Sequence, residues 1–153
     1  MGGTIVCDVT DPLEGRAAAD FANALAARLG LRIVLASVVD AGAAAAPDRV
    51  AGRQRQAGAE RALAAMRDEL AIDVETRVGL GDRAEELARV AAEEGADLVI
   101  VGSRAVGFGG RKLRCGLVRD LEAATPVPVL VAPPSTRKRS ERRLAVAADA
   151  RTR

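Results

Sequence analysis

The segment ADLVIVGSR at residues 96–104 decides how the rest of the chain is interpreted. Its apolar run, Leu98–Val101, is typical of a short strand that is covered on both faces, as the central strands of parallel sheets are. Gly102 follows at once, and Gly107 and Gly109 come shortly after it. A buried strand that leads into a glycine-rich loop predicts a ligand-binding loop at the carboxyl end of a sheet. The alternative is a flexible connection, because short glycine patterns are weak evidence on their own.

Strand-like and helix-like segments alternate on both sides of this segment. We expect strands at residues 4–9, 31–38, 72–78, 97–101 and 127–131, and helices at about 17–29, 48–70, 82–95 and 116–124. We expect the first half of the second helix to be frayed, because Gly52 and Gly58 weaken it. The alternation of strands and helices, with right-handed crossovers, predicts a mostly parallel sheet with helices on both faces. Pro128 lacks a backbone donor, which places the last strand at an edge, but the pattern leaves the strand order open.

Length and composition indicate one globular domain. The chain has 153 residues, of which 49% are hydrophobic and 29% charged, and no apolar run approaches the roughly 20 residues of a membrane span. Residues 1–4 lack the features of a signal peptide, so we expect a cytoplasmic protein. We divide the chain into a domain at residues 1–134 and a basic, disordered tail at residues 135–153. A net charge of +2 does not predict nucleic-acid binding.

The residue types exclude several kinds of chemistry. The chain has no histidine, so Ser-His-Asp and Cys-His nucleophiles are ruled out, and we predict no catalytic residue. The two cysteines lack zinc-ligand spacing, so we expect no structural metal. Cys7 reads as a buried small apolar residue. For Cys115 two interpretations are open, an inert packing residue or a reactive thiol beside Arg114.

From residue 4 to about residue 133 the chain resembles the universal stress protein family. The resemblance rests on GDRAE at residues 81–85, on ADLVIVGSR at residues 96–104 and on PVPVLV at residues 126–131. It implies an α/β three-layer sandwich like that of the adenine nucleotide alpha hydrolases, with a five-stranded parallel sheet in the order 3-2-1-4-5. It also implies a homodimer through the Val127–Val131 strand, and such pairing would cover an exposed apolar edge.

The family's ATP-binding pattern is incomplete in this chain. Members that bind ATP carry G-x2-G-x9-G-[S/T] after the fourth strand, where backbone amides and the hydroxyl hold phosphates. Gly102 matches the first glycine, but Ala105 stands at the second. An ungapped alignment puts Cys115 and Gly116 at the last two positions, and a shift of one residue puts Gly116 and Leu117 there. The hydroxyl is missing in both alignments, so we interpret the motif as degraded.

The family also carries an aspartate after the first strand that helps to hold adenosine. That position falls on Thr10, with Asp11 beside it, and the alternative role of both is turn chemistry, because Asp before Pro often begins a turn. Arg104 adds a cation to a loop whose glycines permit an anion-binding backbone. The candidate ligand contacts are Thr10, Asp11, Val38, Gly102, Arg104, Ala105, Gly107, Gly109, Cys115, Gly116 and Leu117.

The resemblance implies a stress-response regulator that binds ATP, AMP or another phosphorylated ligand in the crevice after the first and fourth strands. The alternative is a homodimeric interaction protein that binds no nucleotide. A third interpretation is a slow ATP hydrolase, although the missing histidine and the missing motif hydroxyl argue against it.

Overall fold

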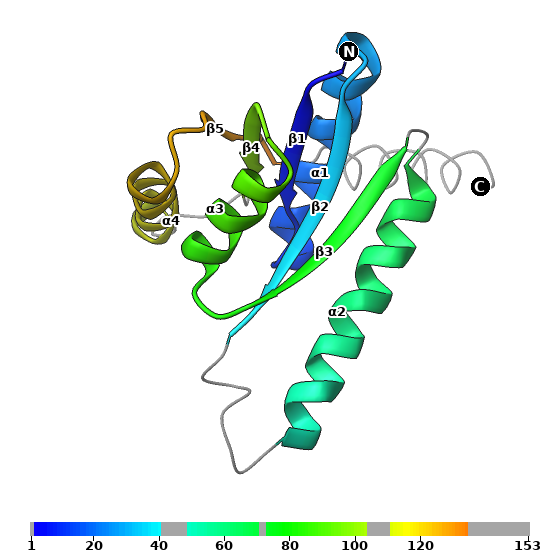
Figure 1. Cartoon of the computed structure of the whole chain (residues 1–153), viewed down its shortest axis with the longest axis vertical. Coiled ribbons are helices and arrows are strands. Elements are labelled where there is room, and N and C mark those ends of the chain that lie inside the picture. Colours follow the sequence, from blue (N-terminus) through cyan, green and yellow to red (C-terminus); the bar gives the residue numbers. More distant parts are fainter. Residues whose placement is uncertain (1, 41–48, 71–72, 104–110, 135–153) are drawn as a thin grey trace, which may run out of the picture.

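Five parallel strands form one sheet in the order β3-β2-β1-β4-β5 in a computed structural model of the chain (Figure 1). The structure describes residues 2–40, 49–70, 73–103 and 111–134, with the backbone alone at residues 111–115. The strands are β1 (Thr4–Asp8), β2 (Arg32–Val39), β3 (Val74–Leu80), β4 (Leu98–Val101) and β5 (Val129–Val131). The helices are α1 (Pro12–Leu29), α2 (Arg49–Glu69), α3 (Arg83–Glu93) and α4 (Arg111–Ala124). The predicted fold class and strand order are confirmed.

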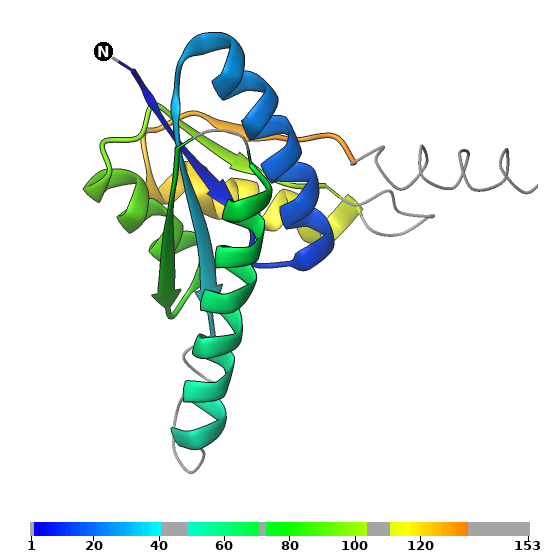
Figure 2. The same ribbon diagram turned by 90° about the vertical axis from the view of Figure 1, so that its right-hand side faces the viewer.

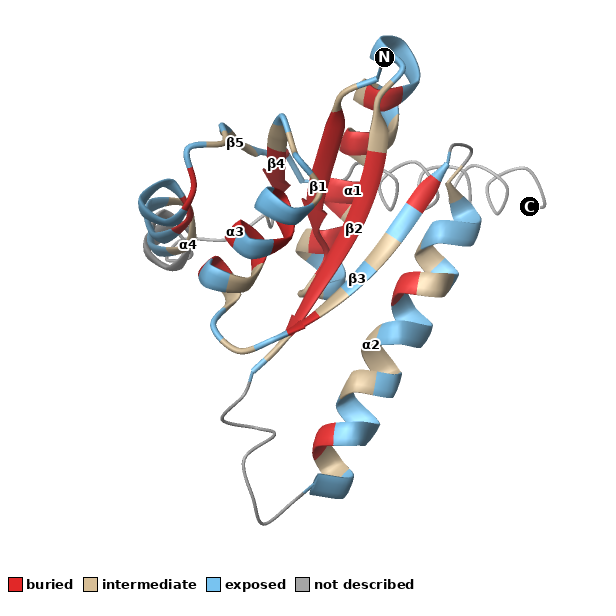
Figure 3. Cartoon of the chain, in the orientation of Figure 1, coloured by how far each residue is buried: buried red, intermediate tan, exposed pale blue. Residues whose placement is uncertain are grey.

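The helices cover the sheet on both faces, which gives the three predicted layers. Figure 2 shows α1 and α2 on one side of the sheet and α3 on the other. Alternate residues of the central strand β1 supply the two cores. Ile5 and Cys7 pack toward α1 and α2, whereas Val6 packs with the residues of α3 and α4. Every residue of β1 is buried (Figure 3).

Cys7 is an inert packing residue, as the sequence predicted. Its side chain has no exposed surface and lies in the core beneath α1. Burial raises the pKa of its thiol well above the usual value, and the negative charges of Asp8 and Asp20 raise it further. A thiol that stays protonated and has no access to solvent is not a nucleophile.

Small residues let α1 lie close to the sheet. Ala18, Ala19 and Ala22 are fully buried on its inner face. A Cβ atom on Gly15 would lie 2.6 Å from the Cα atom of Val9, so this glycine is required for the close approach. Gly30 ends the helix in the left-handed conformation with a φ of 65°, directly after the predicted helix end at residue 29.

Several elements differ from the predicted ones. The α1 helix begins at Pro12 and not at about residue 17, and β3 ends at Leu80 and not at residue 78. The α4 helix begins at Arg111, five residues before the predicted start, because Arg111 to Arg114 are good helix formers that outweigh the glycines around them. The α2 helix is continuous through Gly52 and Gly58 rather than frayed, because it packs against β2 and β3. The β5 strand begins at Val129 instead of Val127. The amide of Val127 donates to the hydroxyl of Thr125 (3.2 Å), which keeps it in the preceding turn.

An ion-pair network joins β2, β3 and the end of α3. Arg32 donates to Glu75 (2.8 Å) and to Glu94 (3.0 Å), and Arg77 also donates to Glu94. Only 6% of the Glu94 side chain is exposed. Burial acts to raise the pKa of Glu94, but the hydrogen bonds from Arg77 and Arg32 outweigh burial and hold the pKa below its ordinary value of 4.5.

Within the residues that the structure describes, no helix is both long enough and apolar enough to cross a membrane. The predicted tail at residues 135–153 lies outside these residues.

Candidate ligand site at the carboxyl ends of the strands

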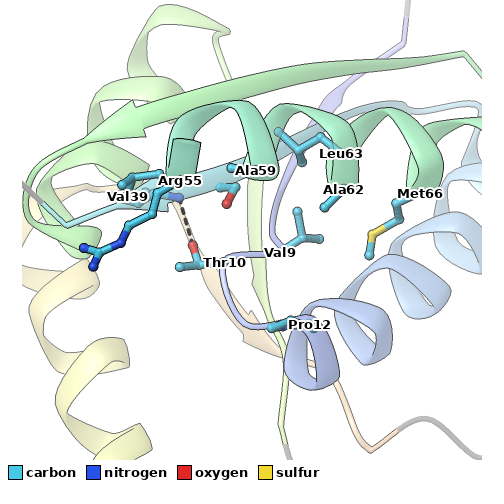
Figure 4. Close-up of a pocket in the computed structure, with 12 residues that line it drawn as sticks. Val9, Thr10, Pro12, Val39, Arg55, Ala59, Ala62, Leu63 and Met66 are labelled. Carbon is cyan, nitrogen blue, oxygen red and sulfur yellow. Dashed lines mark hydrogen bonds between the residues drawn. The ribbon is translucent and has the colours of Figure 1, made fainter. Parts of the chain in front are cut away.

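A cavity of about 410 Å³ opens where β1 and β2 end and α2 passes over them (Figure 4). Its walls are mostly apolar. Val9, Thr10, Pro12, Ser37, Val38, Val39, Arg55, Gly58, Ala59, Ala62, Leu63 and Met66 line it. Its size and its lining, a largely apolar wall with a few polar groups, are those of small-molecule sites in proteins, which have volumes of roughly 300–1,000 Å³.

Thr10 and Val38, two of the predicted contacts, lie side by side in this cavity. The backbone amide of Val38 donates to the Thr10 hydroxyl (3.1 Å), and the hydroxyl donates to the carboxylate of Asp8 (2.6 Å). Figure 4 shows the dashed line that ends on the Thr10 hydroxyl. The hydroxyl therefore fixes the loop after β1 against the end of β2, and it brings together two segments that the sequence separates by 28 residues.

Asp11 has a structural role in the helix that follows. Its carboxylate accepts hydrogen bonds from the amides of Leu13 (2.9 Å) and Glu14 (3.1 Å), so it caps the start of α1. It is not among the residues that line the cavity. Of the two sequence-based interpretations of Asp11, the turn and cap interpretation accounts for these contacts.

A buried carboxylate lies directly beneath Thr10. The Asp8 side chain has no exposed surface, and its Oδ1 atom accepts from the amide (3.0 Å) and the hydroxyl of Thr10. Its Oδ2 atom accepts from Nε (2.9 Å) and Nη2 (2.5 Å) of Arg83, the first residue of α3. Four donors satisfy this buried charge, and the contacts join the end of β1 to the start of α3.

A second hollow, of about 70 Å³, lies at the carboxyl ends of β4 and β5. It is lined by Glu14, Arg83, Val101, Gly102, Leu117, Val118 and Val131. A Cβ atom on Gly102 would lie 1.7 Å from the carbonyl oxygen of Glu14, so the backbone of β4 and the first turn of α1 are in direct contact here. The Glu14 carboxylate also lies 3.7 Å from Arg83 Nη2. The predicted contacts Gly102 and Leu117 therefore meet the first turn of α1 at this hollow and not at the larger cavity.

The remaining predicted contacts fall in two places. Arg104, Ala105, Gly107 and Gly109 lie outside the residues that the structure describes. Cys115 and Gly116 lie inside α4 and not in a loop, because the helix begins at Arg111 and not at the predicted residue 116. Gly116 is exposed, and no atom lies within 4 Å of the place where its Cβ atom would be.

The structure adds four residues that the sequence interpretation missed. Asp8 carried a usable signal, because it is a charged residue in an otherwise apolar strand at the carboxyl end of the sheet. Arg83 and Glu14 carried none, since Arg83 resembles any polar residue in the first turn of a helix and Glu14 precedes the predicted start of the first helix. Arg55 is one of several arginines on a predicted solvated helix, so the sequence does not distinguish it from the others. Within the part of the chain that the structure describes, no cluster of acidic and cysteine side chains is suited to hold a metal ion.

Comparison with solved structures shows the same fold. Hypothetical protein MJ0577 is 19% identical with a TM-score of 0.71, over 88% of this chain and 98% of that one. A universal stress protein in complex with cAMP is 21% identical with a TM-score of 0.61, over 88% and 98%. A universal stress protein family protein from Arabidopsis thaliana with AMP bound is 16% identical with a TM-score of 0.60, over 89% and 94%. At these identities the likeness concerns the fold alone.

Comparison with sequence families is more specific. No curated protein matches the chain. A sequence model of the universal stress protein family matches residues 1–133, which include all five strands and all four helices described above. The chain therefore belongs to the universal stress protein family.

Proposed function

We propose that this protein binds an adenine nucleotide or a related phosphorylated ligand and acts as a stress-response regulator rather than as a fast enzyme. The observation that carries the proposal is the cavity of about 410 Å³ at the carboxyl ends of β1 and β2, where Thr10 and Val38 meet. Ligands of open α/β sheets bind at this end of the strands. Family membership supports the same proposal, since two relatives with this fold hold cAMP and AMP.

The lining of the cavity suits a flat ring with polar edges. Val9, Val38 and Ala59 offer apolar surface, and Ser37 and Thr10 offer hydroxyl groups near it. We also propose that the phosphates contact Gly102 and the segment after it. This part of the proposal comes from the family pattern alone.

Isothermal titration of the full chain with AMP and with ATP tests the proposal. We expect heat of binding for at least one of them, and no heat from either at millimolar concentration would overturn it. Ala59→Phe places a ring in the cavity and should abolish binding. Ala57→Phe is the matched control, because Ala57 is exposed on the same helix and does not line the cavity.

The exposed apolar edge of β5 favours a second candidate function, that of a homodimeric interaction protein without a nucleotide. Val131 at this edge is 45% exposed, and pairing with a second copy would cover it. Light scattering after size-exclusion chromatography should give a dimer for the natural chain and a monomer for Val131→Lys. Val50→Lys is the control, because Val50 is exposed far from this edge, on α2. A stable dimer that shows no heat with nucleotides would favour this candidate over the first.

A further inference from the structure

Ser37 places a hydroxyl where the core of the sheet ends and the cavity begins. Side chains alternate between the two faces along β2, and Ile33 and Leu35 pack into the core on the side of α1 and α2. Ser37 is the next residue on that face, and it lines the cavity together with Ala59 and Leu63 of α2. A polar group therefore continues an apolar row at the point where the row reaches the cavity.

The Ser37 hydroxyl has no partner within the described part of the chain. Only 7% of the residue is exposed, and no hydrogen bond of its hydroxyl occurs among the described residues. Buried polar groups are nearly always hydrogen-bonded, because an unpaired one loses its contacts with water without compensation. An unpaired hydroxyl that lines a cavity is therefore well placed to bind a ligand there.

The Thr10 hydroxyl in the same cavity is already engaged. It donates to the Asp8 carboxylate (2.6 Å) and accepts from the Val38 amide (3.1 Å). A hydroxyl has a single proton to donate, so Thr10 cannot donate to a ligand without breaking its contact with the buried carboxylate. Ser37 makes no such contact with a described residue, so it can donate to a ring nitrogen or accept from an amino group.

The surroundings of Ser37 suit a ring better than a phosphate. The amide of Val9 donates to the carbonyl of Ala36 (2.8 Å), which places Val9 beside Ser37 on the neighbouring chain segment. Figure 4 shows Val9 and Ala59 at the cavity. A phosphate among apolar side chains would lose its water, whereas a flat ring would bury its faces there. This arrangement leaves the phosphates to Gly102, which does not line this cavity.

We propose that Ser37 recognises the ring of the ligand, through a hydrogen bond between its hydroxyl and a nitrogen at the edge of that ring. The inference rests on the proposed function, because it assumes that the ligand occupies the same cavity. It adds the residue that selects a heteroaromatic ring, and it assigns Thr10 to holding the loop after β1 instead of to donating to the ligand.

Titration calorimetry of the full chain with AMP, adenosine and 2′,3′-dideoxyadenosine tests the inference. Ser37→Ala should weaken the binding of all three about fivefold, the effect of one hydrogen bond between neutral groups. An equal loss identifies the ring, because the ring is the part that all three share. Ser37→Thr keeps the hydroxyl and should retain most of the affinity. Thr76→Val is the matched control, because it removes a hydroxyl from the neighbouring strand β3 that does not line the cavity.

Thermal unfolding without ligand separates recognition from a structural role. Ser37→Ala removes no hydrogen bond within the described part of the chain, so the unfolding midpoint should not fall. Thr10→Val removes two hydrogen bonds and should lower the midpoint. A midpoint for Ser37→Ala as low as that of Thr10→Val would show that the Ser37 hydroxyl supports the fold, and it would overturn the inference.

The calorimetric outcomes separate this inference from the proposed function. If the natural chain binds the compounds but Ser37→Ala binds them equally well, or Thr76→Val loses as much affinity, only this inference fails. A loss confined to AMP, or AMP binding with no heat from adenosine, would point to the phosphate and overturn it. A loss that is absent with 2′,3′-dideoxyadenosine would point to the ribose and overturn it too. If the natural chain binds none of the three, the proposed function and this inference fall together.

Discussion

Asp8 at the end of β1 and Arg83 at the start of α3 form a two-donor ion pair, with Nε 2.9 Å and Nη2 2.5 Å from the same carboxylate oxygen. The carboxylate is fully buried, whereas 31% of the Arg83 side chain is exposed. A buried charge that loses its partner keeps the cost of leaving water without the compensating attraction. Removal of one member of the pair should therefore change the free energy of unfolding more than the intact pair contributes to it.

Arg83→Met should lower the free energy of unfolding by about 2 kcal/mol, less than for a fully buried pair because Arg83 is partly exposed. Urea denaturation measures this loss. Asp8→Asn combined with Arg83→Met should recover part of it, since the amide oxygen still accepts from Thr10 and no buried charge remains. The control is Arg89→Met on the same helix, where the exposed pairs with Glu86 and Glu93 contribute little. Equal losses in the Arg83 and Arg89 variants would contradict this account.

The Thr10 hydroxyl makes two hydrogen bonds that a methyl group cannot make. Thr10→Val keeps the shape of the side chain but leaves the Val38 amide and the Asp8 carboxylate each without one partner. We expect a loss of about 1–3 kcal/mol in the free energy of unfolding, measured by urea denaturation. Thr76→Val on β3 should change it little, because no hydrogen bond of the Thr76 hydroxyl occurs in the described part of the chain. Similar losses in the two variants would show that the hydroxyl contacts of Thr10 are unimportant.

The free energy of unfolding should decrease in acid, because Glu94 becomes protonated there. A carboxylate whose pKa is lowered by folding stabilises the folded state above its ordinary pKa of 4.5, and this contribution is lost as the pH falls through the lower folded pKa. Glu94→Gln should therefore be less stable than the natural chain at pH 7, with a difference that shrinks below about pH 4.5. Urea midpoints across this range measure the difference. A constant difference would argue against the ion pairs, and Glu60→Gln on the exposed face of α2 is the control.

Two glycines of the family pattern should respond in opposite ways to a methyl group. Gly102→Ala drives a Cβ atom into the carbonyl oxygen of Glu14 and should cost about 3 kcal/mol or prevent folding. Gly116→Ala meets open space inside α4 and should raise stability by about 0.5–1 kcal/mol, the usual gain of alanine over glycine in a helix. Thermal unfolding of the two variants checks both signs. A stable Gly102→Ala protein would show that β4 and α1 are not in close contact.

The sequence predicted the elements of the fold well because their signals are local. Asp82 stands three residues before Glu85, the local spacing of a helix cap, and its carboxylate accepts from the amide of Glu85 (3.0 Å). Strand order is not a local property, and it came from the family resemblance. The start of α4 was predicted too late because Gly116 resembles a boundary, although a single glycine is tolerated within a helix that packs through Leu121.

The site was predicted less completely, because most of its contacts join distant segments. Thr10 was identified from the family's aspartate position after the first strand, and Val38 is the last residue of the second predicted strand. Arg83 reaches Asp8 across 75 residues, and nothing near either residue in the sequence indicates the other. Arg55 lines the cavity because of which side of α2 faces the ends of β1 and β2, and that orientation is set by tertiary packing.

The two outer strands of the sheet differ in a way that limits self-association. On β3 the side chains of Glu75 and Arg77 are engaged with neighbours inside the same molecule, so an approaching strand would have to disrupt charged contacts. On β5 the exposed Val131 presents no such obstacle. In the dimer proposed above, pairing through β5 about a twofold axis would use the β5 edge of both copies. Growth of that dimer into an open fibre through the described part of the sheet would then be disfavoured.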